Sequence, residues 1–195
     1  MRKWKRFDTA NGPRFRSALA PHEAALLHSL VTSLLGMLDE RETSSPADEL
    51  EEITGMKDGN AKAPEDETMK RLLPDFYRSQ TGHPAGSAAS ESLNSALRSL
   101  HEPEIIDAKR EAAQRLLETV PEGGGRFELS EDDAQAWAAA VNDVRLALGT
   151  MLEVGPEGPD RLPADHPMAG HLDVYQWLTV LQEYLVLGLM GKPNR

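Results

Sequence analysis

The fold is read most directly from residues 123–134, GGGRFELSEDDA, which lead through a tight reversal and a short strand into a helix. The three glycines permit the reversal because glycine adopts backbone conformations that other residues avoid. Residues 126–129 predict a short strand. Ser130 and Asp133 form a near capping box, in which each side chain satisfies the backbone N–H of the other residue. The segment therefore predicts a strand that turns directly into a capped helix.

Apolar spacing predicts the remaining helices. Apolar residues recur at steps of three and four after Ser130, so a helix is expected to about Glu153. Spacing, caps and prolines together predict long helices over 21–41, 104–120 and 171–190, and short ones over 46–54, 68–73 and 93–100. Pro103 is expected to interrupt the chain between the last short helix and the long one, because an internal proline removes a helical hydrogen bond.

The first twenty residues predict a β-hairpin. Basic and aromatic residues alternate over 3–7 (KWKRF) and 14–16 (RFR), and Asn11-Gly12 is a strong turn signal. Residues 78–90 show no periodicity and predict a mobile loop. The fold class is thus mainly α: a single-domain helical bundle over residues 1–195, with a short N-terminal β-hairpin (1–20) and one further short strand.

The N-terminal segment and the segment quoted first show an internal sequence similarity. At a constant offset of 110, Leu19 matches Leu129, Glu23 matches Asp133, Ala24 matches Ala134 and Val31 matches Val141. The match suggests two strand-plus-helix units that pack as pseudo-equivalents. Short patterns of this kind also recur by chance, so both interpretations stay open here.

Composition and charge exclude several classes. The chain has 195 residues and no cysteine, which excludes disulfides, thiolate metal sites and cysteine nucleophiles. No apolar stretch follows the basic N-terminus, and charged and amide residues interrupt the apolar stretch 172–190, so we expect a cytoplasmic chain without a membrane anchor. The net charge is −11, yet residues 1–16 carry six Lys/Arg and one Asp. A short basic arm therefore precedes an acidic body.

The basic arm is the first candidate site. Its basic and aromatic residues are Arg2, Lys3, Trp4, Lys5 and Arg6, joined by Arg14 and Arg16 on the second strand. Basic side chains interleaved with aromatic rings suit contact with nucleic acid or with a protein partner. The alternative, which we favour, is an edge strand whose Lys/Arg residues resist aggregation while Trp4 and Phe7 pack on helices.

Two other segments have paired interpretations. The acidic residues Asp48, Glu49, Glu51 and Glu52 are expected on a solvated helix face, which could equally dock a basic partner. Trp137 and residues 175–178 could line a pocket, although at helical spacing they are more often core. The helices at 46–54 and 68–73 are too far apart in sequence for a helix-turn-helix.

No set of residues predicts catalysis. The densest ligand-like cluster is His101, Glu102, Glu104 and Asp107, and we favour its interpretation as a loop histidine before an acidic first helical turn. No metal-binding histidine spacing, phosphate loop or nucleophile elbow occurs. The sequence predicts a protein that is not an enzyme, with no catalytic, cofactor or metal residues, and an enzyme using a pocket near His101 and Glu104 remains the least favoured alternative.

Several strings together resemble one known family. They are residues 2–6 (RKWKR), 12–16 (GPRFR), 19–23 (LAPHE), 48–55 (DELEEITG), 71–77 (RLLPDFY), 91–94 (ESLN), 100–110 (LHEPEIIDAKR) and 174–179 (VYQWLT). The chain resembles the actinobacterial oxidative-stress transcriptional regulator (AosR) family, formerly a domain of unknown function, over essentially its whole length.

The resemblance implies a cytoplasmic regulator of redox-responsive transcription that acts with an extracytoplasmic-function sigma factor on cysteine-biosynthesis genes. A redox-dependent disulfide attributed to the family cannot form here, because this sequence has no cysteine.

Two functional hypotheses follow. In the first, the acidic body engages a sigma factor or RNA polymerase while the basic N-terminal segment contacts promoter DNA or a second protein. In the second, the chain is a protein-interaction adaptor without direct DNA contact, which the charge of −16 outside residues 1–16 favours.

Overall fold

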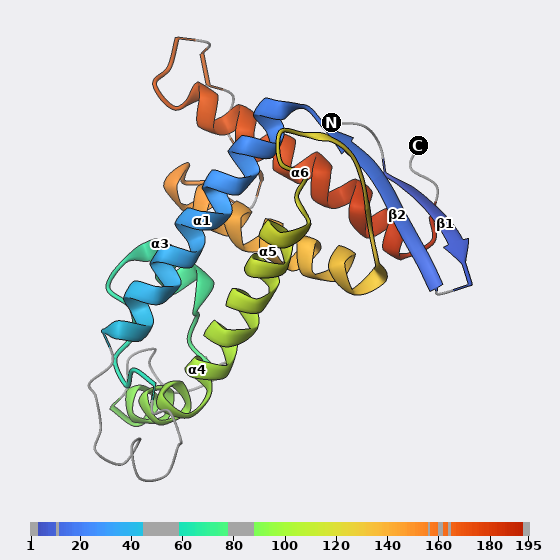
Figure 1. Cartoon of the computed structure of the whole chain (residues 1–195). Helices are drawn as coiled ribbons and strands as arrows, with labels where there is room; N and C mark the ends of the chain where they lie inside the picture. Colours follow the sequence, from blue (N-terminus) through green and yellow to red (C-terminus); the bar gives the residue numbers. More distant parts are fainter. Residues whose placement is uncertain are drawn as a thin grey trace. The chain divides into compact units, whose positions relative to one another are not determined.

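The computed structural model describes residues 4–10, 12–44, 59–77, 88–155, 157–159, 162–163 and 165–192. The helices are α1 (Pro21–Thr43), α3 (Glu67–Leu72), α4 (Ala88–Thr119), α5 (Glu131–Met151) and α6 (Ala169–Leu189). The strands are β1 (Lys5–Thr9), β2 (Gly12–Leu19) and β3 (Gly125–Leu129). Figure 1 labels the helices and the first two strands. The predicted fold class is confirmed: a mainly α chain with an N-terminal hairpin and one further strand.

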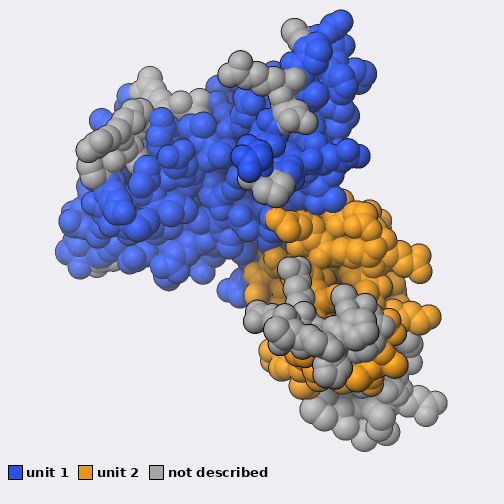
Figure 2. All heavy atoms as spheres, turned by 180° about the vertical axis from the view of Figure 1, so that it is seen from behind, with its two compact units in different colours: residues 1–35, 111–195 blue, residues 36–110 orange. Residues whose placement is uncertain are grey.

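Contacts divide the chain into two compact units (Figure 2). Unit 1 contains Met1–Leu35 and Glu111–Arg195, and unit 2 contains Gly36–Arg110. Helices α1 and α4 each continue from one unit into the other. The single domain over residues 1–195 stays a prediction.

Three long helices lie close to their predicted bounds. α1 and α5 confirm the helices predicted from Pro21 and from the Ser130 cap, and α6 begins two residues earlier than expected. The short helix α3 in unit 2 begins at Glu67, one residue before the predicted turn. The helix predicted over 46–54 lies outside the described residues.

The sheet of unit 1 is antiparallel, in the order β1-β2-β3. Its register places Lys5 opposite Arg16 and Phe7 opposite Arg14 on β1 and β2. Phe15 lies opposite Leu129 and Arg16 opposite Glu128 on β2 and β3. This register brings residues 5, 16 and 128, which are far apart in sequence, into one row across the three strands.

The core of unit 1 lies between the sheet and helices α5 and α6. α5 and α6 pack on each other, α5 packs on β2 and β3, and α6 packs on β1. An aromatic cluster joins the elements: the Trp4 ring meets Phe127 edge-on at 5.4 Å and Trp137 at 5.8 Å. The indole nitrogen of Trp137 donates to the Thr119 hydroxyl at 2.7 Å. Trp137 is completely buried, so it is a core residue and not part of an open pocket.

The two strand-plus-helix segments matched at offset 110 have equivalent local structure. The amide of Ala20 donates to Glu23 Oε2 at 2.7 Å before α1, and the amide of Ser130 donates to Asp133 Oδ2 at 3.1 Å before α5. The amide of Asp133 donates in return to Ser130 Oγ at 3.1 Å, so the predicted capping box is complete. Leu19 and Leu129 are both buried. The matched residues thus cap and anchor the strand-to-helix turns that follow two neighbouring antiparallel strands, one turn at each end of the pair.

Helix α4 differs from the prediction. Residues 88–119 form one helix with Pro103 inside it, so the two helices expected at 93–100 and 104–120 are wrong as separate elements. Proline lacks the N–H that would reach the carbonyl of Ser99. The amide of Gly59 donates to that carbonyl instead, at 2.8 Å. A backbone partner from a distant segment therefore satisfies the carbonyl that the proline leaves free, and the helix continues.

The expected mobile loop over 78–90 also needs correction at its end. Residues 88–90 belong to the first turn of α4, and residues 78–87 lie outside the described part of the chain. Residues 88–90 are Ala, Ala and Ser, and the high helix propensity of alanine is compatible with a helix start there.

Gly59→Ala is expected to destabilise unit 2. A Cβ at residue 59 would lie 2.7 Å from Pro103 Cδ and 3.1 Å from the Ser99 carbonyl oxygen. Since the proline ring cannot rotate away, we expect a loss of about 1–3 kcal/mol in the free energy of unfolding, measured by urea titration. The matched control is Gly36→Ala on α1, where nothing lies within 4 Å and alanine should stabilise the helix by about 0.5–1 kcal/mol. Equal stability of Gly59→Ala and the wild type would contradict the close approach.

The Asp133 cap predicts a pH dependence of stability. Burial would raise the pKa of Asp133, but hydrogen bonds from the Ser130 side chain, from Arg115 and from the Ser130 amide lower it below its usual 3.8. A lowered pKa in the folded state stabilises the fold above about pH 4, and this contribution is lost as pH falls through the folded-state pKa.

Asp133→Asn should therefore cost about 1 kcal/mol at neutral pH and show a shallower loss of stability below pH 4. Thermal melts from pH 2 to pH 7 measure both effects. Asp132→Asn, at the exposed neighbouring position, is the control, and its stability should fall below pH 4 as steeply as that of the wild type. If Asp133→Asn lost stability below pH 4 as steeply as the wild type, Asp133 would not be the source of the pH dependence.

Candidate functional site

The two faces of the sheet have opposite character because side chains alternate along a strand. On β2, Phe15, Ser17 and Leu19 are buried toward the helices. The intervening residues Arg14 and Arg16 point the other way, and Arg16 is exposed. Packing of the inner face therefore presents the basic residues of the hairpin on the outer face.

The outer face collects charges from all three strands. We call it the basic sheet face, and it consists of Lys5, Phe7, Arg14, Arg16, Arg126 and Glu128. The guanidinium of Arg16 lies 4.7 Å from the centre of the Phe7 ring. Its Nη2 is 2.6 Å from Glu128 Oε1. These two contacts fix Arg16 in the middle of the face.

Three cations of the basic sheet face, unlike Arg16, have no carboxylate partner among the described residues. Lys5 and Arg126 are exposed, Arg14 is half-buried, and none of the three makes an ion pair within the described part of the chain. A hollow of about 560 Å³ is lined by Lys5, Arg16, Ser17, Ala18, Arg126, Phe127 and Glu128. The face is thus a shallow site with positive charge available for a ligand or partner.

The structure separates the predicted basic residues into groups. Lys5, Arg14 and Arg16 share the basic sheet face, whereas Arg2 and Lys3 lie outside the described residues. Arg6 points to the opposite side of β1, where its Nη2 is 3.7 Å from Asp8 Oδ1. Its Nη1 is also 2.8 Å from the position that a Cβ of Gly191 would take, so Arg6 lies against the turn after α6.

The aromatic residues of the arm also separate. Trp4 is only 3% exposed and belongs to the core, so in this structure its ring is not available to a partner. Phe7, which was expected to pack on helices, lies instead half-buried on the basic sheet face beneath Arg16. Only the edge-strand interpretation of Trp4 matches its position.

Sequence reasoning missed Arg126 as a site residue. It lies in the predicted third strand, 110 residues from its neighbour Arg16, and its register partner on β2 is Ala18. The RFR and RFE strings at 14–16 and 126–128 were the available signal, because they place an arginine before each inward-facing phenylalanine. The predicted acidic face of Asp48, Glu49, Glu51 and Glu52 lies outside the described residues.

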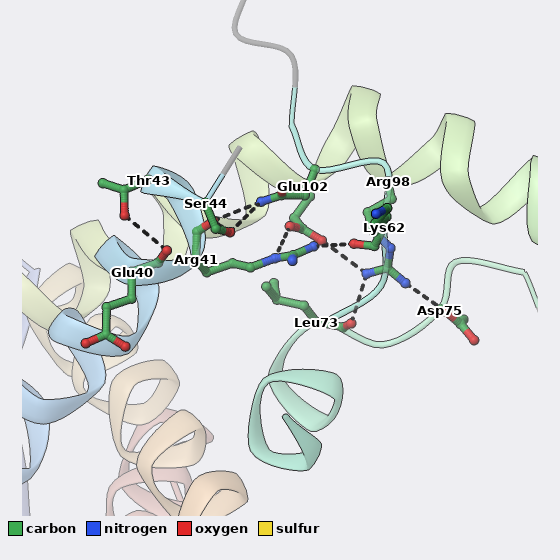
Figure 3. A network of polar contacts seen from close by, with 10 residues as sticks. Glu40, Arg41, Thr43, Ser44, Lys62, Leu73, Asp75, Arg98 and Glu102 are labelled. Atoms are coloured by element: carbon green, nitrogen blue, oxygen red, sulfur yellow. Dashed lines mark hydrogen bonds and ion pairs between the residues drawn. The ribbon is translucent and has the colours of Figure 1, made fainter. Parts of the chain in front are cut away.

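The ligand-like cluster around His101 forms a buried ion-pair network in unit 2 (Figure 3). Glu102 is 1% exposed, and its two oxygens accept from Arg41 Nε at 2.7 Å and Arg98 Nη1 at 3.1 Å. Arg98 also bonds Asp75 at 2.7 Å and the carbonyl of Leu73. The interpretation of this cluster as an acidic first turn is wrong, because α4 begins at Ala88 and Glu102 lies in its interior.

The neighbouring residues of this cluster have other surroundings. His101 stacks obliquely on Phe76 with ring centres 6.0 Å apart, and Asp107 pairs with Arg110 at 2.6 Å. Over the residues that the structure describes, no three His, Cys, Asp or Glu side chains gather as a metal site would require. In the same residues no helix has the length and apolar character needed to cross a bilayer.

Comparison with known proteins identifies the family. Residues 1–189 match the model of a family described as "Domain of unknown function (DUF2017)". The chain is also 66% identical over 194 residues to the "Oxidative stress regulator AosR" of Mycobacterium tuberculosis (strain ATCC 25618 / H37Rv), covering 98% of this chain and 89% of that protein. The chain belongs to the AosR family.

Other AosR family members match equally well. The "Oxidative stress regulator AosR" of Mycobacterium bovis and the "Putative oxidative stress regulator AosR" of Mycobacterium leprae are each 66% identical to this chain, with the same coverage of both proteins. No solved structure matches the chain. The family resemblance inferred from the sequence strings is confirmed.

Glu102→Gln is expected to destabilise unit 2 strongly. The substitution keeps the shape of the side chain but leaves two arginines, 10% and 2% exposed, without the carboxylate between them. Breaking a buried pair in this way costs about 3–5 kcal/mol, which urea titration measures. Glu67→Gln removes the exposed pair with Lys70 and should leave the midpoint near that of the wild type. A small effect of Glu102→Gln would show that the network is solvated.

Proposed function

We propose that this chain regulates oxidative-stress-responsive transcription through a protein partner, a sigma factor or RNA polymerase. The proposal rests on the 66% identity, over 98% of the chain, to proteins named oxidative stress regulators. Identity of that extent over the whole chain supports a shared regulatory role. A partner in the transcription machinery would act in the cytoplasm, so we propose that location as well.

A regulatory role also agrees with the chemistry of the described side chains. Glu102, the most ligand-like carboxylate of the sequence, has both oxygens bonded to arginines. His101 faces the ring of Phe76. Neither is placed as a general acid or base beside a nucleophile, which supports the proposal that the chain is not an enzyme.

The redox signal needs a route that does not use thiols of this chain. The sequence contains no cysteine, so no thiol can be oxidised and no disulfide can form within it. We propose that the partner receives the signal and that this chain changes the partner's activity. The proposal keeps the regulatory role while dropping the disulfide that the family resemblance implied.

The second candidate is an adaptor without direct DNA contact. The chain has a net charge of −11, and duplex DNA carries about one negative charge per 1.7 Å of its axis. Of the basic residues on the N-terminal strands, Arg6 is paired with Asp8 and Arg16 with Glu128. This partial neutralisation favours contact with a protein over contact with promoter DNA.

Binding assays with purified components test the proposal. We expect the full chain to co-elute in size-exclusion chromatography with RNA polymerase or with at least one stress sigma factor. Promoter binding is measured in parallel by fluorescence anisotropy at about 50 mM salt, where electrostatic contacts are strongest. Absence of binding in both assays would remove the proposed function.

The Arg2, Lys3, Lys5 and Arg6 quadruple alanine variant separates the two candidates. Loss of a salt-sensitive promoter signal in this variant supports direct DNA contact. Unchanged binding to the protein partner, with no DNA signal from the wild type, supports the adaptor. Thermal melts confirm that the variant is folded before the comparison.

A further inference from the structure

We propose that the basic sheet face binds a short acidic segment of a protein partner in extended conformation. The inference rests on the proposed function, because it assigns a surface to the partner contact. The carboxylates of the segment would meet Lys5, Arg126 and Arg14, and its backbone would cross the hollow between them. Arg126, which no sequence motif singled out, becomes a central contact.

The positive charge of the face is available and preorganised. Lys5 and Arg126 line the same hollow from β1 and β3, and neither is neutralised by an ion pair among the described residues. Arg16 stands between them, held by Phe7 at 4.7 Å and by Glu128 at 2.6 Å. Because strands hold these side chains, the cations do not need to be gathered when a ligand binds.

The hollow adds a shape that suits a peptide. Its volume is about 560 Å³, within the range of sites that take a small ligand or a few side chains. Ala18 and Phe127 contribute apolar character to a lining whose other residues are charged or polar. An acidic segment with an apolar residue between its carboxylates fits this combination of contacts.

The surroundings of the face favour a short acidic peptide over nucleic acid. A strand of five residues spans about 16 Å, so the positive strip is short. Exposed carboxylates adjoin β3: Glu122 before it, and Glu131 and Asp132 after it. These carboxylates lie next to the basic strip along the chain, and exposed charges interact over about 8 Å at physiological salt. A long polyanion would meet the acidic residues as well as the strip, whereas a short segment need not.

Charge reversal on the intact chain tests the proposal. The probe is a fluorescein-labelled peptide of alternating glutamate and leucine. A peptide of alternating lysine and leucine, single-stranded DNA and double-stranded DNA are measured as separate arms. Lys5→Glu/Arg126→Glu is compared with Lys62→Glu/Arg71→Glu, which changes the net charge equally at exposed positions of unit 2. We expect the Kd for the acidic peptide to rise at least tenfold in the first variant and less than twofold in the second.

The outcomes distinguish failure of the proposed surface from failure of the proposed function. Equal affinity of both variants for the acidic peptide, no binding of that peptide by the wild type, or tighter binding of either DNA would each overturn the proposal. Matching melting temperatures establish that the variants fold, which we expect because the substituted side chains are exposed. If Lys5→Glu/Arg126→Glu still co-elutes with the polymerase or sigma factor, this surface is wrong while the proposed function stands. If the wild type itself fails to co-elute, the proposed function fails independently of the peptide result.

Discussion

The packing of one side of a three-stranded sheet determines the surface chemistry of unit 1. Phe15, Leu19 and Leu129 are buried between the strands and the helices α5 and α6. Strand alternation then leaves Arg14 and Arg16 no position except the opposite face. A chain with a net charge of −11 thus acquires a local basic surface as a consequence of core formation. The aromatic ring of Trp4 contributes to this constraint from the inside.

Unit 2 depends on polar groups buried together. Glu102 joins Arg41 from α1 to Arg98 within α4, and Asp75 and the Leu73 carbonyl complete the surroundings of Arg98 (Figure 3). Such networks hold elements in one arrangement because a misplaced member would leave a buried charge unpaired. The hydrogen bond from the Gly59 amide to the Ser99 carbonyl likewise satisfies a backbone group that would otherwise have no partner in the helix.

Membership of the AosR family gives these features a biological setting. The relatives are named as oxidative stress regulators, and this chain shares two thirds of its residues with them without containing a thiol. The regulation through a partner that we propose requires only a stable scaffold and a surface that the partner recognises. The basic sheet face is the surface that we propose for this contact, and the buried network of unit 2 holds the helices of that unit in place.

The sequence by itself determined the local structure: the helix caps at Glu23 and Asp133, the hairpin, the third strand and the apolar faces of α1, α5 and α6. These features depend on residues within a few positions of each other. Only tertiary structure decided that α4 continues through Pro103, that Glu102 is buried between two arginines, and that Arg126 lies on the same face as Lys5 and Arg16. Each of these depends on a contact between residues far apart in sequence: Gly59 with Ser99, Arg41 with Glu102, and β2 with β3. A spacing pattern cannot register a contact that chain folding alone brings together.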